Sequence, residues 1–339
     1  MNIIMYMIKD DLEIILVTYN RKPYLKRTLE QLFSESSPVK DFQITILDNH
    51  SDDGSAELID EYCTNFPNLK HITHNRNIGG NANIARAFEI AKKKYVWVIC
   101  DDDYYEWGNW HYVEDAIENQ DHDCIVVARN QIRNEHSISD IMFQLTFLPS
   151  AIYKTATVDT TVMRNIYDNI HNMSPHFAVG ANIANTTKDF YVIPKDVVIN
   201  GASKDSADGK KTADMSYTRD NDTKRLSPEA RNMHFFIGYV NSLILLNDKN
   251  AVMNGLRSAV AYKPFCQNLT GIFVRVVQKS YKDKRCSNFY YDVACRVDFI
   301  SKCLLTIIKY SPIFLYVAPK GIHLLLLGRL NIRLIPFKL

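Results

Sequence analysis

The feature that most constrains this chain is a regular alternation, from Glu13 to Ala128, of short β-branched runs with amphipathic stretches. This pattern is typical of βαβ units, in which each strand is followed by a helix that covers the sheet. It therefore predicts an α/β fold with a mainly parallel central sheet. The expected strands are Glu13–Thr18, Gln43–Leu47, Lys70–Thr73, Tyr95–Cys100 and Cys124–Ala128.

Between these strands the apolar residues recur at helical spacing, which predicts helices with one buried face. The predicted faces are Leu25, Leu29, Leu32 and Phe33, then Leu58, Ile59 and Tyr62, then Ile84, Ala87, Phe88 and Ala91. The GxGxxG sequence of a dinucleotide-binding Rossmann domain does not follow the first strand. This argues against that domain despite the similar alternation.

After about residue 130 the pattern is less regular. Apolar clusters at Phe143–Leu148 and Phe190–Pro194 predict further strands. Residues 201–232 are polar and lack an apolar period, which predicts either a functional loop that closes over a ligand or plain disorder. Helical stripes return at His234–Leu246, Leu269–Tyr281 and Phe289–Tyr310.

We therefore expect two parts, an α/β domain over residues 1–232 and a helical C-terminal extension over residues 233–339. After Asp298 the chain has no acidic residue, and its basic residues are Lys302, Lys309, Lys320, Arg329, Arg333 and Lys338. Its apolar runs are broken into pieces shorter than the ~20 residues of a membrane-spanning helix. Two readings stay open: a segment lying on an anionic membrane surface, or helices packed on the protein's own core.

The overall charge and the cysteines narrow the class of protein. With 40 basic against 38 acidic residues the net charge is +2, which excludes a nucleic-acid binder that depends on a basic surplus. The seven cysteines form no CxxC pair, and the first residues lack the features of a signal peptide. We expect a cytoplasmic protein, peripheral on the inner face of the cell membrane if the tail binds lipid.

The sequence feature that most directly indicates chemistry is Asp101-Asp102-Asp103, directly after the apolar strand Tyr95–Cys100. Ligands of open α/β sheets bind at the carboxyl ends of the strands. Adjacent carboxylates repel one another unless they are solvated or neutralised, and Mg²⁺ or Mn²⁺ meets that need. In an extended segment Asp101 and Asp103 point to the same side, so we expect these two to hold one metal ion. A solvated acidic loop is the alternative.

Four segments in this order resemble the inverting family 2 glycosyltransferases with the GT-A fold. They are Val17–Arg21, Leu47–Ser55, Asn75–Gly80 and Asp101–Asp103. The resemblance is close over residues 12–130 and loose over residues 130–200. It implies a GT-A, nucleotide-diphospho-sugar transferase fold. It also implies donor-binding roles for Thr18, Tyr19, Asn20, Asp48, Asn49, Asn77, Gly79, Asn83, Asp101 and Asp102.

Each segment also has a physical role of its own. Asp48, by the resemblance, accepts a hydrogen bond from the N–H of a uracil or thymine ring. The run from Asn77 to Gly79 leads into a helix and permits close approach of backbone to a phosphate, or it is only a tight connection. Thr18 to Asn20 line a nucleotide pocket, or they cap the helix that contains Pro23. Asn81, Asn83 and Arg86 are spaced differently from the Arg-Asn pair that commonly opens this helix in the family.

On the acceptor side, Ser174–Phe177 stands where many family members carry a Glu-Asp pair whose Asp is the catalytic base. His176 is the predicted base here, since a histidine accepts protons near neutral pH, and a structural role is the alternative. Asp189 and Asp196 are the fallback carboxylates. His234 is a candidate metal ligand in place of the family's histidine, because the corresponding strand ends here in Asn200.

The sequence thus predicts a glycosyltransferase that transfers a sugar, most simply from a UDP-sugar, with inversion and with Mn²⁺ or Mg²⁺. The predicted acceptor is a glycan or lipid-linked saccharide of bacterial polysaccharide, O-antigen, capsule or lipooligosaccharide synthesis. One alternative is a non-catalytic protein that binds sugar nucleotides or a membrane surface. A sugar-nucleotide pyrophosphorylase is the other, although the Gly-rich basic loop of that class is not visible near the start.

Overall fold

The computed structural model describes residues 8–172, 174–208, 238–239 and 241–261. These residues fall into two compact units, one made of residues 8–208 with 245–247 and the other of residues 238–244 with 248–261. The predicted helical stripes beyond residue 261 and the basic tail lie outside the described residues. Among the helices that the structure describes, none has the length and apolar character needed to cross a membrane.

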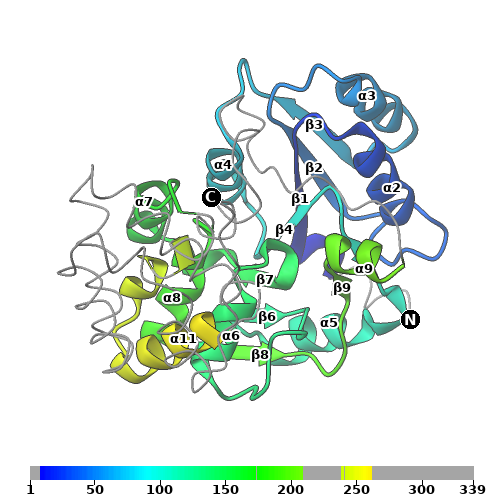
Figure 1. Ribbon diagram of the computed structural model, residues 1–339. Helices are drawn as coiled ribbons and strands as arrows, with labels where there is room; N and C mark the ends of the chain where they lie inside the picture. The colour runs from blue at the N-terminus through cyan, green and yellow to red at the C-terminus, as the bar shows by residue number, and fades with distance from the viewer. Residues whose placement is uncertain (1–7, 173, 209–237, 240, 262–339) are drawn as a thin grey trace, which may run out of the picture. The chain divides into compact units, whose positions relative to one another are not determined.

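The first unit contains a seven-stranded sheet in the order β3-β2-β1-β4-β7-β6-β8 (Figure 1). Its first four strands in space are parallel, and β7 is antiparallel to both of its neighbours. The strands are β1 (Leu12–Thr18), β2 (Gln43–Asp48), β3 (Leu69–Thr73), β4 (Tyr95–Cys100), β6 (Cys124–Val126), β7 (Ala151–Lys154) and β8 (Phe190–Val192). The mainly parallel central sheet that the sequence predicts is therefore confirmed.

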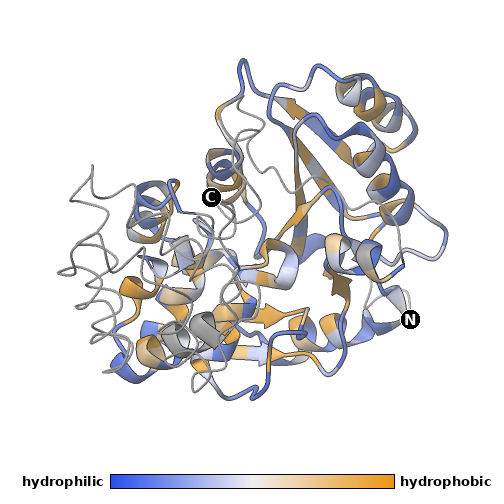
Figure 2. Ribbon diagram, in the orientation of Figure 1, coloured by the Kyte–Doolittle hydropathy of each residue, from blue (hydrophilic) through white to orange (hydrophobic). Residues whose placement is uncertain are grey.

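The predicted helical faces are the buried ones. Helices α2 (Lys22–Leu32) and α3 (Ser55–Asn65) cover one face of the sheet, and α4 (Gly80–Ile90) covers the other (Figure 1). Leu25, Leu29 and Ile59 are fully buried against Ile14 and Leu16 of β1. Figure 2 shows hydrophobic residues concentrated along the strands beneath these helices. Ala91 is only partly buried, because α4 ends at Ile90.

Smaller elements extend this core. The helices are α5 (His111–Asp115), α6 (Ile138–Gln144), α7 (Thr160–Asp168), α8 (Phe177–Asn185), α9 (Gly201–Ala207) and, in the second unit, α11 (Lys249–Ala261). Short helical turns are η1 (Trp107–Asn109), η2 (Ala116–Gln120), η3 (Leu148–Ser150), η4 (Thr155–Thr157) and η6 (Leu243–Leu245). A second sheet pairs β5 (Tyr104–Tyr105) with β9 (Val198–Ile199) in antiparallel register. This pair places the start of α9 beside the residues that follow β4.

One sequence prediction is wrong, and a second is wrong at its first residues. Phe143–Leu148 is not a strand, because α6 runs through Gln144 and is followed by a turn that leads into η3. Ser137 caps α6 by accepting a hydrogen bond from the Asp140 amide. The polar segment 201–232 begins with a helix, because Gly201–Ala207 forms α9, whereas its residues 209–232 lie outside the described residues and the prediction for them stays untested. By contrast, β8 confirms the strand predicted at Phe190–Pro194.

Candidate active site

The predicted donor-binding residues lie at the carboxyl edge of the parallel strands. Thr18 ends β1 and pairs in register with Asp48, which ends β2. On the other side of β1, Val17 pairs with Cys100, the last residue of β4. The strand order β2-β1-β4 therefore places Asp48 on one side of Thr18 and Asp101 on the other. This arrangement follows from the parallel topology alone, because the carboxyl ends of parallel strands meet at one edge.

Asp101 is buried and contacts Thr18, the last residue of β1. Its Oδ2 accepts a hydrogen bond from Thr18 Oγ1 at 2.7 Å, and its Oδ1 forms an ion pair with Arg21 Nη1 at 2.8 Å. Arg21 also contacts Asp102 Oδ2 at 2.5 Å. Burial and the charge of Asp102 raise the pKa of Asp101 to about 6, although Arg21 opposes the shift. Arg21 thus partly neutralises two of the three carboxylates.

Asp103 is the least compensated carboxylate of the triplet. Its side chain is 1% exposed. Its Oδ1 accepts a hydrogen bond from the Gly201 amide at 2.9 Å, whereas its Oδ2 is buried and finds no hydrogen-bond partner among the described residues. Burial and the neighbouring Asp102 charge raise the pKa of Asp103 well above its usual value. A buried carboxylate oxygen without a partner is costly, and a bound cation removes that cost.

The triplet does not continue the strand. Residues 101–102 form a bend after β4, so the alternation of an extended segment does not apply. Among the described residues, the donor atoms that converge belong to Cys100, Asp102 and Asp103, and they lie within 4.8 Å of one another. Asp101 is instead engaged by Thr18 and Arg21. The assignment of a metal ion to Asp101 together with Asp103 therefore stays a prediction, and the observed geometry favours Asp102 as the partner of Asp103.

These residues fit a divalent cation. Asp102 and Asp103 offer the hard oxygen donors that Mg²⁺ and Mn²⁺ prefer. The Asp103 oxygen without a hydrogen-bond partner is the observation that supports the fit. In the same cluster Cys100 contributes a softer sulfur donor.

Three side chains of α2 hold the backbone of the triplet, and the sequence reasoning missed all three. Thr28 Oγ1 donates to the Asp101 carbonyl at 2.9 Å, and Gln31 Nε2 donates to the Asp103 carbonyl at 3.1 Å. Arg27 Nη2 donates to the Asp102 carbonyl at 2.5 Å. The sequence signal is a set of polar residues interleaved with the apolar face of a predicted helix, which does not reveal their partners.

Arg27 also joins the triplet to α9. Its Nη1 donates to Tyr104 Oη at 2.7 Å and lies 3.3 Å from Asp205 Oδ1. Tyr104 Oη donates to the same Asp205 oxygen at 2.5 Å. Asp205 is 1% exposed. Polar contacts therefore hold helix α9 to α2 and β5, in addition to the Gly201 amide on Asp103.

Asp48, the last residue of β2, is fully buried and accepts hydrogen bonds from the loop that follows it. Its Oδ1 accepts hydrogen bonds from the Ser51 amide at 3.0 Å and the Ser51 hydroxyl at 2.5 Å. His71 Nε2 lies 3.9 Å from Asp48 Oδ2, an oxygen that has no hydrogen-bond partner. Burial favours a higher pKa, but the approach of His71 and the Ser51 hydrogen bonds outweigh it and lower the pKa of Asp48. Asp48 is thus an ionised acceptor.

Asparagines build the connection between β3 and α4. Asn49 Nδ2 donates to Asn77 Oδ1 at 2.7 Å, and Asn49 Oδ1 accepts from the Ile78 amide at 2.9 Å. Asn83 Nδ2 donates to the Leu47 carbonyl at 3.1 Å. Gly79 has a φ of 88°, a left-handed value that favours glycine. These contacts join Asn49 to Asn77 and Asn83 to the end of β2, and the Gly79 amide donates to Asn77 Oδ1 at 2.8 Å. The donor-binding roles of these residues stay a prediction.

The segment after β1 is tied to the segment after β2. The Asn20 amide donates to Ser51 Oγ at 2.9 Å, and the Asn20 side chain exchanges two hydrogen bonds with Asp52. The N-cap of α2 is Arg21, whose side chain forms no capping bond, so Thr18 to Asn20 do not cap this helix. Asp53 Oδ2 instead accepts from the Lys22 amide at 2.9 Å. Tyr19 is partly exposed beside these contacts.

His176 is 1% exposed and lies inside the protein. Its Nε2 donates to the Leu145 carbonyl at 2.8 Å, between α6 and α8, and its Nδ1 has no hydrogen-bond partner within the part of the chain that the structure describes. Burial lowers the pKa of His176 to about 4. These contacts support the structural alternative and give the predicted catalytic role no support, because a base must reach the acceptor hydroxyl.

Asp189 precedes β8 at the amino edge of the sheet, opposite the edge that carries Asp101. Its Oδ1 contacts His122 Nδ1 at 2.6 Å, and its Oδ2 accepts from the Asp123 amide at 3.0 Å. Because β6 and β8 run in the same direction as β4, their beginnings lie away from the site. This placement gives the fallback role of Asp189 as a base no support, and that role stays a prediction.

Asp196 and His234 are the two remaining candidate residues, and only Asp196 lies among the described residues. Asp196 follows β8, and its Oδ1 accepts from the Arg129 amide at 2.6 Å. His234 lies outside the described residues, so its metal role stays a prediction.

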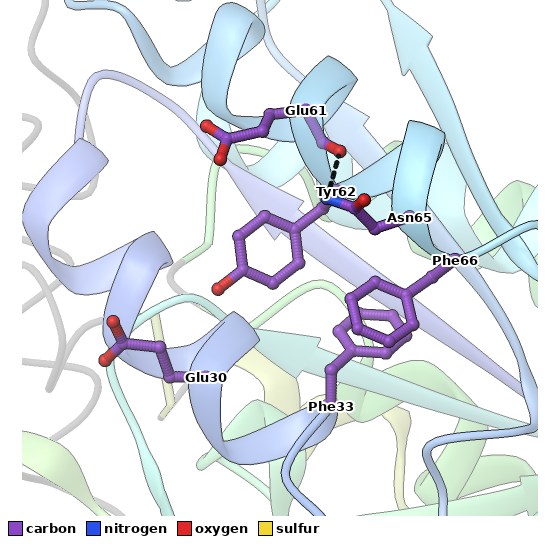
Figure 3. A pocket seen from close by; sticks show the side chains of 6 residues that line it. All are labelled: Glu30, Phe33, Glu61, Tyr62, Asn65 and Phe66. Atoms are coloured by element: carbon purple, nitrogen blue, oxygen red, sulfur yellow. Dashed lines mark hydrogen bonds between the residues drawn. The ribbon is translucent and has the colours of Figure 1, made fainter.

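A surface pocket lies between the C-terminal ends of α2 and α3, and no predicted donor-binding residue lines it. The rings of Phe33 and Phe66 stack there with centroids 4.1 Å apart, beside Tyr62 (Figure 3). Glu30, Glu61 and Asn65 complete the lining. The carboxylate cluster is built from other residues, so this pocket is separate from the candidate active site.

The model of the family described as Glycosyl transferase family 2 matches residues 13–182 of this chain. The chain belongs to glycosyl transferase family 2. The match contains the ends of β1, β2 and β4 and the whole Asp triplet. Gly201 and Asp205, which contact the triplet region from α9, lie beyond it.

Curated proteins share a shorter segment with this family 2 chain. Abequosyltransferase RfbV of Salmonella typhimurium is 34% identical over 88 residues, which are 25% of this chain and 26% of that protein. Poly(ribitol-phosphate) beta-glucosyltransferase of Bacillus spizizenii is 29% identical over 94 residues, which are 27% of this chain and 15% of that protein. The similarity thus spans about a quarter or less of these relatives.

Solved structures show the fold over most of the chain. S. aureus TarS 1-349, in complex with UDP-GlcNAc, has 15% identity and a TM-score of 0.59, with 88% of this chain and 87% of that chain covered. The mannosyltransferase PcManGT from Pyrobaculum calidifontis, in complex with GDP-Man and Mn²⁺, has 13% identity and a TM-score of 0.52, covering 88% and 84%. The GT-A fold predicted from the sequence is confirmed.

Proposed function

We propose that this chain is a glycosyltransferase that transfers a sugar from a nucleotide diphosphate, most simply a UDP-sugar, to a glycan or lipid-linked acceptor with inversion. Membership of family 2 supports the reaction class. The observation that carries the proposal is the buried triplet Asp101–Asp103 at the sheet edge that Asp48 also occupies. TarS and PcManGT, which share the fold, were solved with UDP-GlcNAc and with GDP-Man.

Asp48 supports a uridine donor. Its carboxylate only accepts hydrogen bonds, and its Oδ2 is free of a hydrogen-bond partner in the described contacts. A uracil ring presents one N–H that matches such an acceptor. Ser51 holds the opposite oxygen, so the orientation of the carboxylate is fixed before the nucleotide binds.

Asp102 and Asp103 are the residues that would hold a divalent cation, and Arg27 and Gln31 hold their backbone carbonyls in place. A bound Mn²⁺ or Mg²⁺ supplies neutralisation of the diphosphate leaving group. Arg21 lies at the same carboxylates and provides further positive charge. A base takes the proton of the acceptor hydroxyl, and the hydroxyl oxygen bonds to the anomeric carbon from the face opposite the leaving group. The bond between that carbon and the diphosphate oxygen breaks with the electron pair going to the diphosphate, so this single displacement inverts the configuration.

The decisive experiment compares Asp103→Asn with Asp41→Asn, an exposed carboxylate in the loop before β2. Transfer and donor hydrolysis are measured with a panel of nucleotide sugars and Mn²⁺. We expect Asp103→Asn to lower kcat/KM by about 100-fold or more, the usual effect of losing electrostatic stabilisation of a leaving group. Asp41→Asn should not change it. Transfer at wild-type speed in Asp103→Asn rejects the proposal.

The second candidate function is a sugar-nucleotide binding protein without turnover. The observation that favours it is the burial of His176 where relatives carry their catalytic base. Tight binding of a nucleotide sugar, with neither transfer nor hydrolysis under any metal, selects this alternative.

A further inference from the structure

Cys100 ends β4 immediately before the Asp triplet, and nothing in the proposed function uses it. It is partly exposed and forms no disulfide. Its sulfur and one oxygen each from Asp102 and Asp103 lie within 4.8 Å of one another. We propose that the Cys100 sulfur is the third donor of the cation site formed by Asp102 and Asp103. This inference rests on the proposed function only for the presence of that cation.

A second observation points to a ligand at this cluster. Asp103 is 1% exposed, and none of the described residues forms a hydrogen bond with its Oδ2. Burying such an oxygen without a partner is unfavourable, and more so when it is charged. A cation shared by Asp102, Asp103 and Cys100 gives this oxygen a partner and relieves the repulsion between the two carboxylates.

The separation of the donors suits one ion. In the tetrahedral geometry of zinc sites, a zinc–sulfur bond of about 2.3 Å and a zinc–oxygen bond of about 2.1 Å place the two donor atoms roughly 3.6 Å apart. The donor atoms of this cluster, within 4.8 Å of one another, therefore need to approach by at most roughly 1.2 Å. Side-chain rotation at the end of a strand provides such a change without moving the sheet.

The simpler reading is that Cys100 only completes an apolar strand. Cys124 illustrates that role, because it begins β6 and is fully buried among core side chains. Cys100 differs in two ways: it is partly exposed, and its sulfur lies within 4.8 Å of a carboxylate oxygen of both Asp102 and Asp103. The placement of a soft donor beside two hard ones sets the chemical class of the ion. The site should hold Zn²⁺ or Cd²⁺ more tightly than a site of two carboxylates does, and it should discriminate more strongly against Mg²⁺.

The test is a Cd²⁺ titration of the full chain, followed by the sulfur-to-metal charge-transfer absorbance in the near ultraviolet. We compare wild type with Cys100→Ser, and use Cys63→Ser, a partly exposed cysteine in α3, as the matched control. Because the chain has seven cysteines, the difference between wild type and each variant isolates the single sulfur. We expect Cys100→Ser to lose one sulfur's share of the band and to weaken Cd²⁺ binding by about 10-fold or more. Cys63→Ser should not change either quantity.

Asp103→Asn gives a second readout, because it keeps the sulfur but removes a co-ligand. We expect it to weaken Cd²⁺ binding while the Cys100 band reappears at higher Cd²⁺. If Cys100→Ser does not fold, Cys100→Val, which suits a strand, replaces it. An unchanged band in the Cys100 variant overturns the inference, as does unchanged affinity in Asp103→Asn. Mn²⁺-dependent transfer by wild type with no Cys100 band refutes only this inference, whereas the band without any transfer refutes only the proposed function.

Discussion

At the residue scale, the candidate active site is defined by buried carboxylates that differ in how they are compensated. Asp48 has two hydrogen bonds from Ser51 and the approach of His71. Asp101 accepts a hydrogen bond from Thr18 and forms an ion pair with Arg21. Among the described residues, Asp103 accepts one hydrogen bond, from the backbone amide of Gly201. The least compensated group is therefore the one from which a cation gains most, and the better compensated Asp48 is suited to accept a neutral N–H.

This difference predicts a specific effect of Asp48→Asn. The new amide presents a donor toward the ring N–H of uracil, while its oxygen retains the Ser51 bonds. We expect the Kd of UDP to rise about 10- to 100-fold, as for loss of a hydrogen bond to a charged group. Isothermal titration calorimetry of wild type, Asp48→Asn and the exposed control Asp41→Asn measures this. Equal Kd values in all three proteins would remove Asp48 from the nucleotide site.

His71 and Asp48 predict a pH dependence of stability. The carboxylates of Asp48 and Asp60 raise the pKa of His71 above its ordinary value of 6.5, so protonated His71 stabilises the fold fully below pH 6.5. That contribution is lost as the pH rises through the raised pKa. The pKa of Asp48 is below its ordinary value of 3.8, so its contribution is present above pH 3.8 and is lost as the pH falls through the lowered value.

The destabilisation caused by His71→Gln should therefore be largest between pH 3.8 and 6.5 and should shrink as the pH rises further. Urea unfolding at a series of pH values measures this difference in the free energy of unfolding. His136→Gln, at an exposed position, is the control and should show no such window. A His71→Gln effect that is constant from acid to alkaline pH contradicts the assignment.

At the element scale, much of the parallel half of the sheet could be predicted. Buried parallel strands read as short apolar runs bounded by polar residues, so β4 was predicted with its exact bounds and β1, β2 and β3 within one residue. The run Phe143–Leu148 was misassigned because a short apolar run does not distinguish a strand from a buried helix. Helix α9 was missed because polar contacts to Arg27 and Asp103, which leave no apolar period, hold it in place.

The same limit applies to the site. The end of each strand located Thr18, Asp48 and Asp101 because topology brings parallel strand ends together. The donor atoms of Asp102 and Asp103 converge because the chain bends after β4, and the sequence pattern does not predict that bend. The buried position of His176 likewise depends on how α6 and α8 pack.

Gly201 shows how closely α9 approaches the triplet. A Cβ at this position would lie 1.8 Å from the Asp102 carbonyl oxygen, which is impossible without moving the backbone. We expect Gly201→Ala to destabilise the fold by about 1–3 kcal/mol, as for overpacking, and to lower transfer activity because the triplet is displaced. Gly108→Ala is the matched control, since a Cβ there meets no atom within 4 Å. Its effect should stay within about 0.5 kcal/mol. Equal thermal midpoints for the two variants would show that α9 does not hold this position in solution.

At the scale of the whole molecule, the charge is distributed unevenly along the chain. Six of the 40 basic residues and none of the 38 acidic residues lie after Asp298, so the preceding residues carry a net charge of −4 and the tail carries +6. The tail lies outside the described residues, and both readings of its sequence stay open. The proposed function includes a lipid-linked acceptor, which would be presented at a membrane. A basic and apolar tail would bind an anionic membrane surface and so bring the enzyme to such an acceptor.

This gives a prediction for the full chain on anionic vesicles. Each Lys or Arg near such a surface contributes about 1 kcal/mol, so replacing all six basic residues of the tail with Gln should weaken binding by more than 100-fold. Binding of the wild-type chain should also fall steeply between low and high salt, because the Debye length shortens. Vesicle flotation with phosphatidylserine against phosphatidylcholine measures both effects, and a variant with six surface Lys residues of the first unit changed to Gln controls for total charge.

Transfer to a water-soluble acceptor should be unchanged in the tail variant, because the residues proposed to bind the donor lie elsewhere. Equal flotation of wild type and tail variant would instead favour a tail packed on the protein's own core.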